Sequence, residues 1–359
     1  MTDTEKNNPD DERLRLKYND ALEKAEGGDP AAQLEVGRLL FEGVGVRRNR
    51  GEAARWFEKG FRACRKLAET GDADALFALA GCYDDGTGVF RDDRKATELY
   101  RKAARAGSAR AAYRLGTRCA LGLGAPRDEA AALAWYKAGA EGGDADACRA
   151  LALACARGEG CAPDPAEALA LHRKAADGGN GPSSADLARA LLNGDGCDRD
   201  VPGAVLYFTK AFEQGVVSAA ADLGLLYYDG GAEDADAEKA ALWLGRAVES
   251  GETSAFCAYA DLLRNGRGVA RDARRANFLI HEAAFDGDAP AQFELGRLYF
   301  EGREVAADRE KGIRWWKESA YNGFPPARRR LAELGFTEAD WTDPDDLYDD
   351  DDQFSPDEE

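Results

Sequence analysis

The chain has 359 residues, is 44% hydrophobic and carries a formal net charge of −19, and its last 17 residues contain ten carboxylates and no basic side chain. Phosphate neutralisation dominates nucleic-acid affinity, and bilayer surfaces are anionic, so we expect neither nucleic acid nor a membrane as the main partner. No stretch approaches the roughly 18 apolar residues of a membrane span and the first 12 residues have no apolar core, so a cytoplasmic protein is expected.

One pattern recurs through most of the chain with a period of 36 residues. A marker glycine returns at Gly71, Gly107, Gly143, Gly179, Gly215, Gly251, Gly287 and Gly323. A second glycine follows each of the first seven markers after 15 residues, an Asp after six more, and a small residue four residues later. A period in the mid-thirties is typical of a solenoid built from helix pairs.

The N-terminal part departs from this period. Residues 1–9 are expected to be disordered, and residues 10–27 to form a helix that caps the end of the stacked repeats. The first repeat starts at Gly28, and its next marker glycine comes after 43 residues rather than 36. Seven extra residues are almost two helical turns, and Phe61, Cys64 and Leu67 continue the apolar stripe. The sequence therefore predicts an extended second helix here rather than a long loop.

The repeat from Gly71 shows the pattern of the later ones. Apolar side chains recur at helical spacing over 73–84, which predicts the first helix. Gly86 should end it, because the residue past a helix end often takes a left-handed conformation that suits glycine. Asp92 or Asp93 should cap the second helix by accepting from its free N–H groups. That helix should end at Gly107.

Two repeats and one segment depart from the pattern. Gly179–Pro182 replaces the usual Gly-Asp start and is interpreted as a candidate flexible point. The repeat from Gly215 has Ala232 and Glu233 in place of the loop glycine and valine, which predicts a differently shaped loop. The last full repeat has Glu304 where most have glycine.

The C-terminal part divides into three segments. The repeats, about eight and a truncated last one, should extend over residues 28–336. Residues 337–342 should form a short end segment in which Trp341 packs back on the last repeat. Residues 343–359 should be a disordered acidic tail, because a block of like charge cannot bury enough apolar surface to order itself.

The chain shows no constellation of catalytic or metal-ligating residues. Its cysteines occupy positions of small buried hydrophobes, and Cys148 and Cys155 lie about 10 Å apart along one helix, too far to bridge. His172 and His281 lie three repeats apart, whereas a metal site needs ligands that converge. No nucleophile elbow, phosphate loop or dinucleotide fingerprint occurs in a strand context. The sequence therefore predicts no enzyme, no cofactor and no metal.

The repeat resembles the Sel-one-like repeat (SLR), a relative of the tetratricopeptide repeat. The matching residues in one unit are Gly287, Asp288, Ala291, Leu295, Gly296, Tyr299, Gly302, Val305, Asp308, Trp315, Trp316 and Ala320. The resemblance covers residues 28–330. It implies an all-α, right-handed superhelical solenoid of antiparallel helix pairs that acts as an adaptor or scaffold for protein complexes. A secreted branch of the family carries a cysteine pair in each repeat, which this chain lacks.

By analogy with tetratricopeptide proteins, the first helices should line a concave groove. Positions 3, 6, 7, 10, 13 and 14 after each marker glycine would then face it. These positions predict a basic stripe at the middle of the groove, formed by Arg110, Tyr113, Arg114, Arg149, Arg157 and Arg189. Since Arg pairs bidentately with carboxylates and phosphates, the hypothesis is that the groove binds an acidic or phosphorylated segment. The alternative is that these arginines pair with Asp146 and Asp186 and are solvated.

Residues 343–359 suggest a further hypothesis. This acidic tail could occupy the groove of its own chain or of a neighbour until a partner displaces it, the alternative being an unattached, solubilising tail. For the whole chain, the main prediction is a noncatalytic protein-binding adaptor. The other two readings are a cell-wall-related hydrolase or small-molecule binder, activities linked to some members of the family, and a structural spacer.

Overall fold

The computed structural model describes residues 9–124, 126–230, 236–303 and 305–341. The predictions for residues 1–8, for Ala232 and Glu233, for Glu304 and for the acidic tail lie outside these ranges. The described ranges contain helices and no strand, which confirms the all-α fold class. They belong to two compact units, Met1–Ser183 and Ser184–Glu359.

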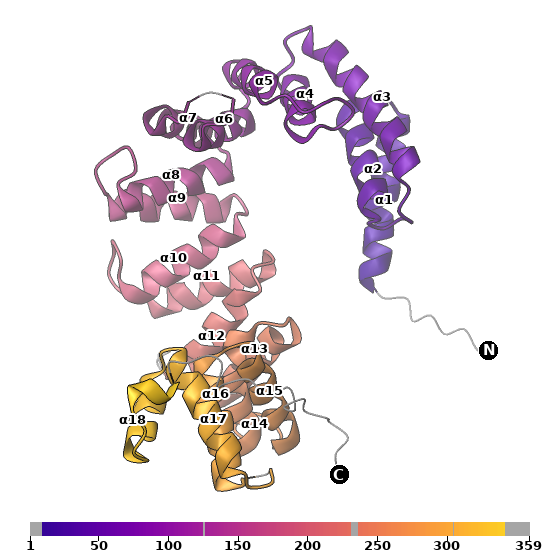
Figure 1. Cartoon of the computed structure of the whole chain (residues 1–359). Helices are drawn as coiled ribbons and strands as arrows, with labels where there is room; N and C mark the ends of the chain where they lie inside the picture. The colour runs from indigo at the N-terminus through magenta and orange to yellow at the C-terminus, as the bar shows by residue number, and fades with distance from the viewer. Residues whose placement is uncertain (1–8, 125, 231–235, 304, 342–359) are drawn as a thin grey trace, which may run out of the picture. The chain divides into compact units, whose positions relative to one another are not determined.

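The helices follow one another in antiparallel pairs in chain order (Figure 1). In the first unit they are α1 (Pro9–Glu26), α2 (Pro30–Glu42), α3 (Arg50–Ala68), α4 (Ala73–Asp85), α5 (Asp93–Arg105), α6 (Ala109–Leu121), α7 (Glu129–Glu141), α8 (Ala145–Arg157) and α9 (Pro165–Asp177). The boundary between the units falls within α10 (Gly181–Asn193).

The second unit continues with α11 (Val201–Glu213), α12 (Ser218–Tyr228), α13 (Ala237–Glu249), η1 (Thr253–Ala255), α14 (Phe256–Asn265), α15 (Ala273–Phe285), α16 (Ala289–Glu301), α17 (Arg309–Tyr321), α18 (Pro325–Glu333) and η2 (Glu338–Trp341). Even-numbered helices from α2 to α18 are the first helices of their repeats, and odd-numbered helices from α3 to α17 are the second helices. No helix in the described ranges is long and apolar enough to cross a bilayer.

The length of α3 confirms the predicted extended helix. It has 19 residues, whereas the second helices of the later repeats have 13. The extra turns bury Cys64. The insertion therefore lengthens a helix and adds no loop.

Side-chain caps set most helix starts. Asp72 accepts from the backbone N–H of Ala75 at 2.7 Å, and Asp92, rather than Asp93, caps α5 by accepting from the N–H of Lys95 at 3.0 Å. Asn180 takes the same role for α10, because its Oδ1 accepts from the N–H of Ser183 at 2.9 Å. The sequence departure at 179–182 thus keeps a capped helix start.

Glycines in the first helices allow close packing against the second helices. Gly37 faces Phe57, Gly116 faces Tyr136 and Gly296 faces Trp316. A Cβ atom at these glycines would lie only 2.5, 2.7 and 2.5 Å from the respective ring. Glycine is required here because the backbone approaches an aromatic ring closely, and this contact holds each helix pair together.

Apolar contacts close the two ends of the described chain. On α1, Ala21 and Ala25 are buried in one cluster with Val36 and Leu40 of α2. At the other end, Trp341 is buried with Trp316, Leu331 and their neighbours, which confirms the predicted packing of the end segment.

Candidate functional site

The first helices of the first unit lie side by side. α2 contacts α4, and α6 contacts α8. Between α4 and α6, the Arg110 guanidinium lies over the Phe77 ring, 4.6 Å from its centroid. The helices α2, α4, α6 and α8 therefore form one surface, which we call the first-helix face.

An exposed stripe runs along α6 on this face. Arg110, Arg114 and Leu121 are separated by four and seven residues, which places them on one side of a helix. All three are exposed, Leu121 by 66%. Within the described ranges, no carboxylate oxygen lies within 4.0 Å of either guanidinium. We call these three residues the α6 stripe.

Three other residues predicted for the groove have different surroundings. Tyr113 is half-buried, and its ring centroid lies 6.1 Å from that of Tyr136. Arg149 is half-buried on α8. Arg157, at the end of α8, is exposed and forms an ion pair with Glu159 at 3.5 Å. Tyr113 thus contributes to the packing of its helix pair, and Arg157 is engaged by the following loop.

Arg189 belongs to the second unit and is paired there. Its guanidinium lies 2.8 Å from Asp222 and 3.6 Å from Asp186. Arg189 therefore pairs with neighbouring carboxylates, Asp186 among them, as the alternative to binding an acidic segment predicts. Asp146 instead accepts a hydrogen bond from Asn180 Nδ2 at 2.8 Å. Because Arg189 lies in a different compact unit, the structure does not place it with the arginines of α6 and α8.

A polar cleft borders the α6 stripe. It has a volume of about 610 Å³, and Arg110, Asp144, Asp146 and Asn180 are among the residues that line it. Burial raises the pKa of the Asp144 carboxyl, and the charge of Asp146 acts in the same direction, whereas Arg110 opposes them. Arg110 therefore both contacts an aromatic ring and lines a cleft that contains carboxylates.

A buried arginine that the repeat pattern does not predict supports α6. Arg118 is only 3% exposed. It lies 11 residues after its marker glycine, a position held in the other repeats by Leu39, Cys82, Ala154, Ala190, Leu226, Leu262 and Leu298. An ionic side chain thus replaces a core residue in this repeat alone among the eight.

The donors of Arg118 are satisfied by α4 and α5. Nε donates to Thr97 Oγ1 at 2.8 Å, and Nη2 donates to the backbone oxygen of Asp93 at 2.8 Å and to its carboxylate at 3.0 Å. Nη1 pairs with Asp84, which also accepts from the Tyr100 hydroxyl at 3.3 Å. The Arg118 guanidinium lowers the pKa of Asp93, with Arg91 adding to the effect. This network fixes α6 against the preceding repeat. In the sequence, it is indicated only by an arginine at a position that is apolar in the other repeats.

The histidines and cysteines are packed within the described chain. His172 and His281 are buried, His172 Nδ1 lies 3.5 Å from Ser183 Oγ, and His281 stacks on Phe285 at 4.5 Å. All cysteines are free thiols, and burial raises the pKa of Cys82 to about 12. Among the residues that the structure describes, no group of three or more His, Cys, Asp or Glu is arranged to hold a metal ion.

A protein-family model and solved structures both match the repeats of this chain. The Sel1 repeat model matches residues 30–63, 73–108, 109–144, 145–180, 182–216, 217–252, 255–288 and 289–324. The chain is similar to a protective antigen of uropathogenic Escherichia coli that displays an SLR fold (26% identity, TM-score 0.68, covering 93% of this chain and 81% of that one). It is also similar to a Sel1 repeat protein from Oxalobacter formigenes (28% identity, TM-score 0.58, covering 88% and 89%). No curated protein matches.

Proposed function

Because the chain belongs to the Sel1 repeat family, whose repeats generally serve as protein–protein interaction scaffolds, we propose that it is a noncatalytic, cytoplasmic adaptor. Its partner is a protein or peptide segment that is acidic or phosphorylated. The segment binds on the first-helix face along the α6 stripe, with the half-buried Arg149 on the neighbouring helix.

The observation that carries this proposal is the pair of exposed guanidinium groups on α6. Arg110 and Arg114 are four residues apart, so they are separated by about 6 Å along the helix. That spacing suits two anionic groups of one segment, each held by the two parallel N–H donors of a guanidinium. The cation–π contact with Phe77, at 4.6 Å from the ring centroid, favours a fixed position of the Arg110 guanidinium beside α4.

Leu121 adds an apolar contact to the two cations. It lies at the end of α6, seven residues beyond Arg114, which is about 10 Å along the helix. Its side chain is 66% exposed, so it offers apolar contact area to a segment that lies along α6. The stripe therefore fits a segment with acidic residues at one end and an apolar residue at the other.

The thiols support the noncatalytic part of the proposal. A nucleophilic cysteine needs a pKa below its usual value. Burial instead raises the pKa of Cys64 and Cys155 to about 11 and that of Cys257 to about 12, so these thiols stay protonated at neutral pH.

Co-purification from the native host, followed by mass spectrometry, tests the proposal. We expect a protein that is enriched with the wild type to be lost with Arg110→Glu/Arg114→Glu. The matched control is Arg94→Glu/Arg101→Glu, which makes the same charge change at exposed positions of α5. A partner retained by the α6 variant would contradict this site, and the absence of any enriched protein would contradict the adaptor function.

A further inference from the structure

In three repeats, a loop glycine lies against the second helix of the preceding repeat. A Cβ on Gly124, Gly160 or Gly268 would lie 2.5, 3.5 or 2.0 Å from a backbone oxygen of that helix. The oxygen belongs in each case to the first residue of the helix: Asp93 of α5, Glu129 of α7 and Ala237 of α13. The loop of the next repeat thus normally covers the first turn of a second helix.

The extended helix α3 breaks this arrangement. Gly88 lies against Phe57, the eighth residue of α3: a Cβ atom on Gly88 would lie 2.7 Å from the backbone oxygen of Phe57. The seven residues before it, 50–56, are therefore not covered by the next loop. Ala54 is exposed as a result, whereas its counterparts are buried or half-buried: Thr97, Leu133, Leu169, Val205, Ala241, Asn277 and Ile313.

The uncovered part of α3 belongs to the most basic stretch of this acidic chain. Residues 47–66 contain eight basic and two acidic side chains, and all eight basic residues are exposed. Arg55, Lys59, Arg62 and Lys66 are spaced by four, three and four residues, so they lie along one side of the helix.

The two carboxylates of this stretch are already engaged. Glu52 accepts from Asn49 Nδ2 at 3.0 Å, and Glu58 pairs with Arg62. In the described part of the chain, no carboxylate oxygen lies within 4.0 Å of Arg55 or Lys59. The basic side therefore keeps a net positive charge that the fold does not neutralise.

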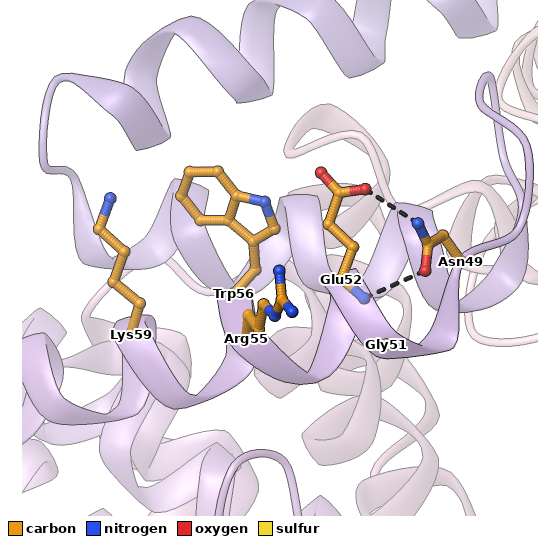
Figure 2. Close-up of a pocket in the computed structure, with 6 residues that line it drawn as sticks. All are labelled: Asn49, Gly51, Glu52, Arg55, Trp56 and Lys59. Atoms are coloured by element: carbon orange, nitrogen blue, oxygen red, sulfur yellow. Dashed lines mark hydrogen bonds between the residues drawn. The ribbon is translucent and has the colours of Figure 1, made fainter.

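A cleft opens at the uncovered turns. It has a volume of about 480 Å³ and is lined by Asn49, Gly51, Glu52, Arg55, Trp56 and Lys59 (Figure 2). Trp56 is half-buried, and the Lys59 ammonium lies over its ring, 4.6 Å from the centroid. An indole beside unpaired cations combines a large apolar contact area with charge.

We propose that Arg55, Trp56, Lys59, Arg62 and Lys66, here called the α3 surface, form a second docking site, separate from the α6 stripe. Its occupant is an acidic protein segment whose carboxylates face the basic side and whose apolar side chain packs on Trp56. The four basic residues extend over about 16 Å of helix, which is the length of roughly five residues of extended chain. Charge complementarity selects the acidic partner, and the uncovered turns keep Arg55 and Trp56 accessible.

Fluorine NMR of the full chain labelled with 5-fluorotryptophan tests this site directly. The chain has six tryptophans, and Trp56→Phe identifies the resonance of Trp56. The probe is a twelve-residue synthetic peptide of glutamates with one central leucine, and its neutral control has glutamine in place of glutamate. We expect the acidic probe to shift the Trp56 resonance selectively and the effect to weaken as salt is added.

Two double variants complete the test. Arg55→Glu/Lys59→Glu should abolish the Trp56 shift, whereas Arg94→Glu/Arg101→Glu on α5 should retain it. An unshifted Trp56 resonance, or an equal shift with the neutral peptide, would overturn the proposal. A duplex DNA oligonucleotide that shifts Trp56 at lower concentration than the peptide would overturn the partner class. Since Arg110→Glu/Arg114→Glu leaves the α3 surface intact, the two proposed sites can fail independently.

Discussion

Replacing Arg118 with leucine tests the physical account of the first unit. Four other repeats have a buried leucine at this position, for example Leu39 and Leu262, and they pack there without a buried charge. The variant removes the cationic partner of Asp84 and leaves the Thr97 hydroxyl and the Asp93 carboxylate with fewer hydrogen bonds.

The expected loss follows from the exposure of the two carboxylates. Removing one partner of a fully buried ion pair costs about 3–5 kcal/mol. The side chains of Asp84 and Asp93 keep 21% and 38% of their accessible surface, so water recovers part of that energy. We therefore expect Arg118→Leu to lower the local stability of α4 to α6 by about 2 kcal/mol.

Native-state hydrogen exchange is the appropriate assay, because repeat proteins can open locally. Amides of α5 and α6 should exchange faster in the variant, and those of α15 and α16 should be unchanged. Arg118→Leu/Asp84→Asn should recover about 1 kcal/mol, because it removes the orphaned charge. A single variant within about 0.5 kcal/mol of the wild type, a typical surface effect, would refute the reasoning.

Three further predictions follow from the packing and the pKa shifts. The pKa of Asp93 is lowered in the folded state, so its interaction with Arg118 stabilises the fold above the unfolded pKa of about 3.9. This stabilisation is lost as the pH falls through the lower folded pKa. The cost of Arg118→Leu should therefore shrink in denaturation experiments below about pH 4. Gly296→Ala should lower the melting temperature, with a cost of about 1–3 kcal/mol, because its Cβ would lie 2.5 Å from an indole ring. The control Gly81→Ala, whose Cβ meets nothing within 3.8 Å, should stabilise by about 0.5–1 kcal/mol. Cys82 should react with a thiol reagent at pH 7 at least about tenfold more slowly than a free cysteine, and a fast reaction would contradict its burial.

The regular part of the fold could be predicted because its signals are local and repeated. The marker glycines, the capping aspartates and the apolar spacing determine each helix pair within about 36 residues. The extension of α3 followed from the same logic, since seven added residues preserve the face of a helix. The unusual residues at 179–182 suggested a flexible point, but the pattern could not show that Asn180 replaces the usual aspartate as the helix cap.

The candidate site was only partly accessible from sequence. The spacing placed Arg110 and Arg114 on an exposed side of α6, but it could not show that Arg189 pairs with Asp222, 33 residues away in the chain. Arg118 stands out against the repeat pattern, yet its partners on α4 and α5 depend on how the repeats dock. The basic composition of residues 47–66 is visible in the sequence. Which turns of α3 stay uncovered depends on the contact between Gly88 and Phe57, which the sequence does not show.

Site-specific photo-crosslinking in the native host tests the adaptor function most directly. Benzoylphenylalanine would replace Leu121 at the end of the α6 stripe or, as a control, the exposed Ala134 on α7. A discrete protein adduct from position 121, absent at position 134 and abolished by Arg110→Glu/Arg114→Glu, is the predicted result. No adduct at position 121, or the same adducts at both positions, would contradict binding of a protein segment along α6.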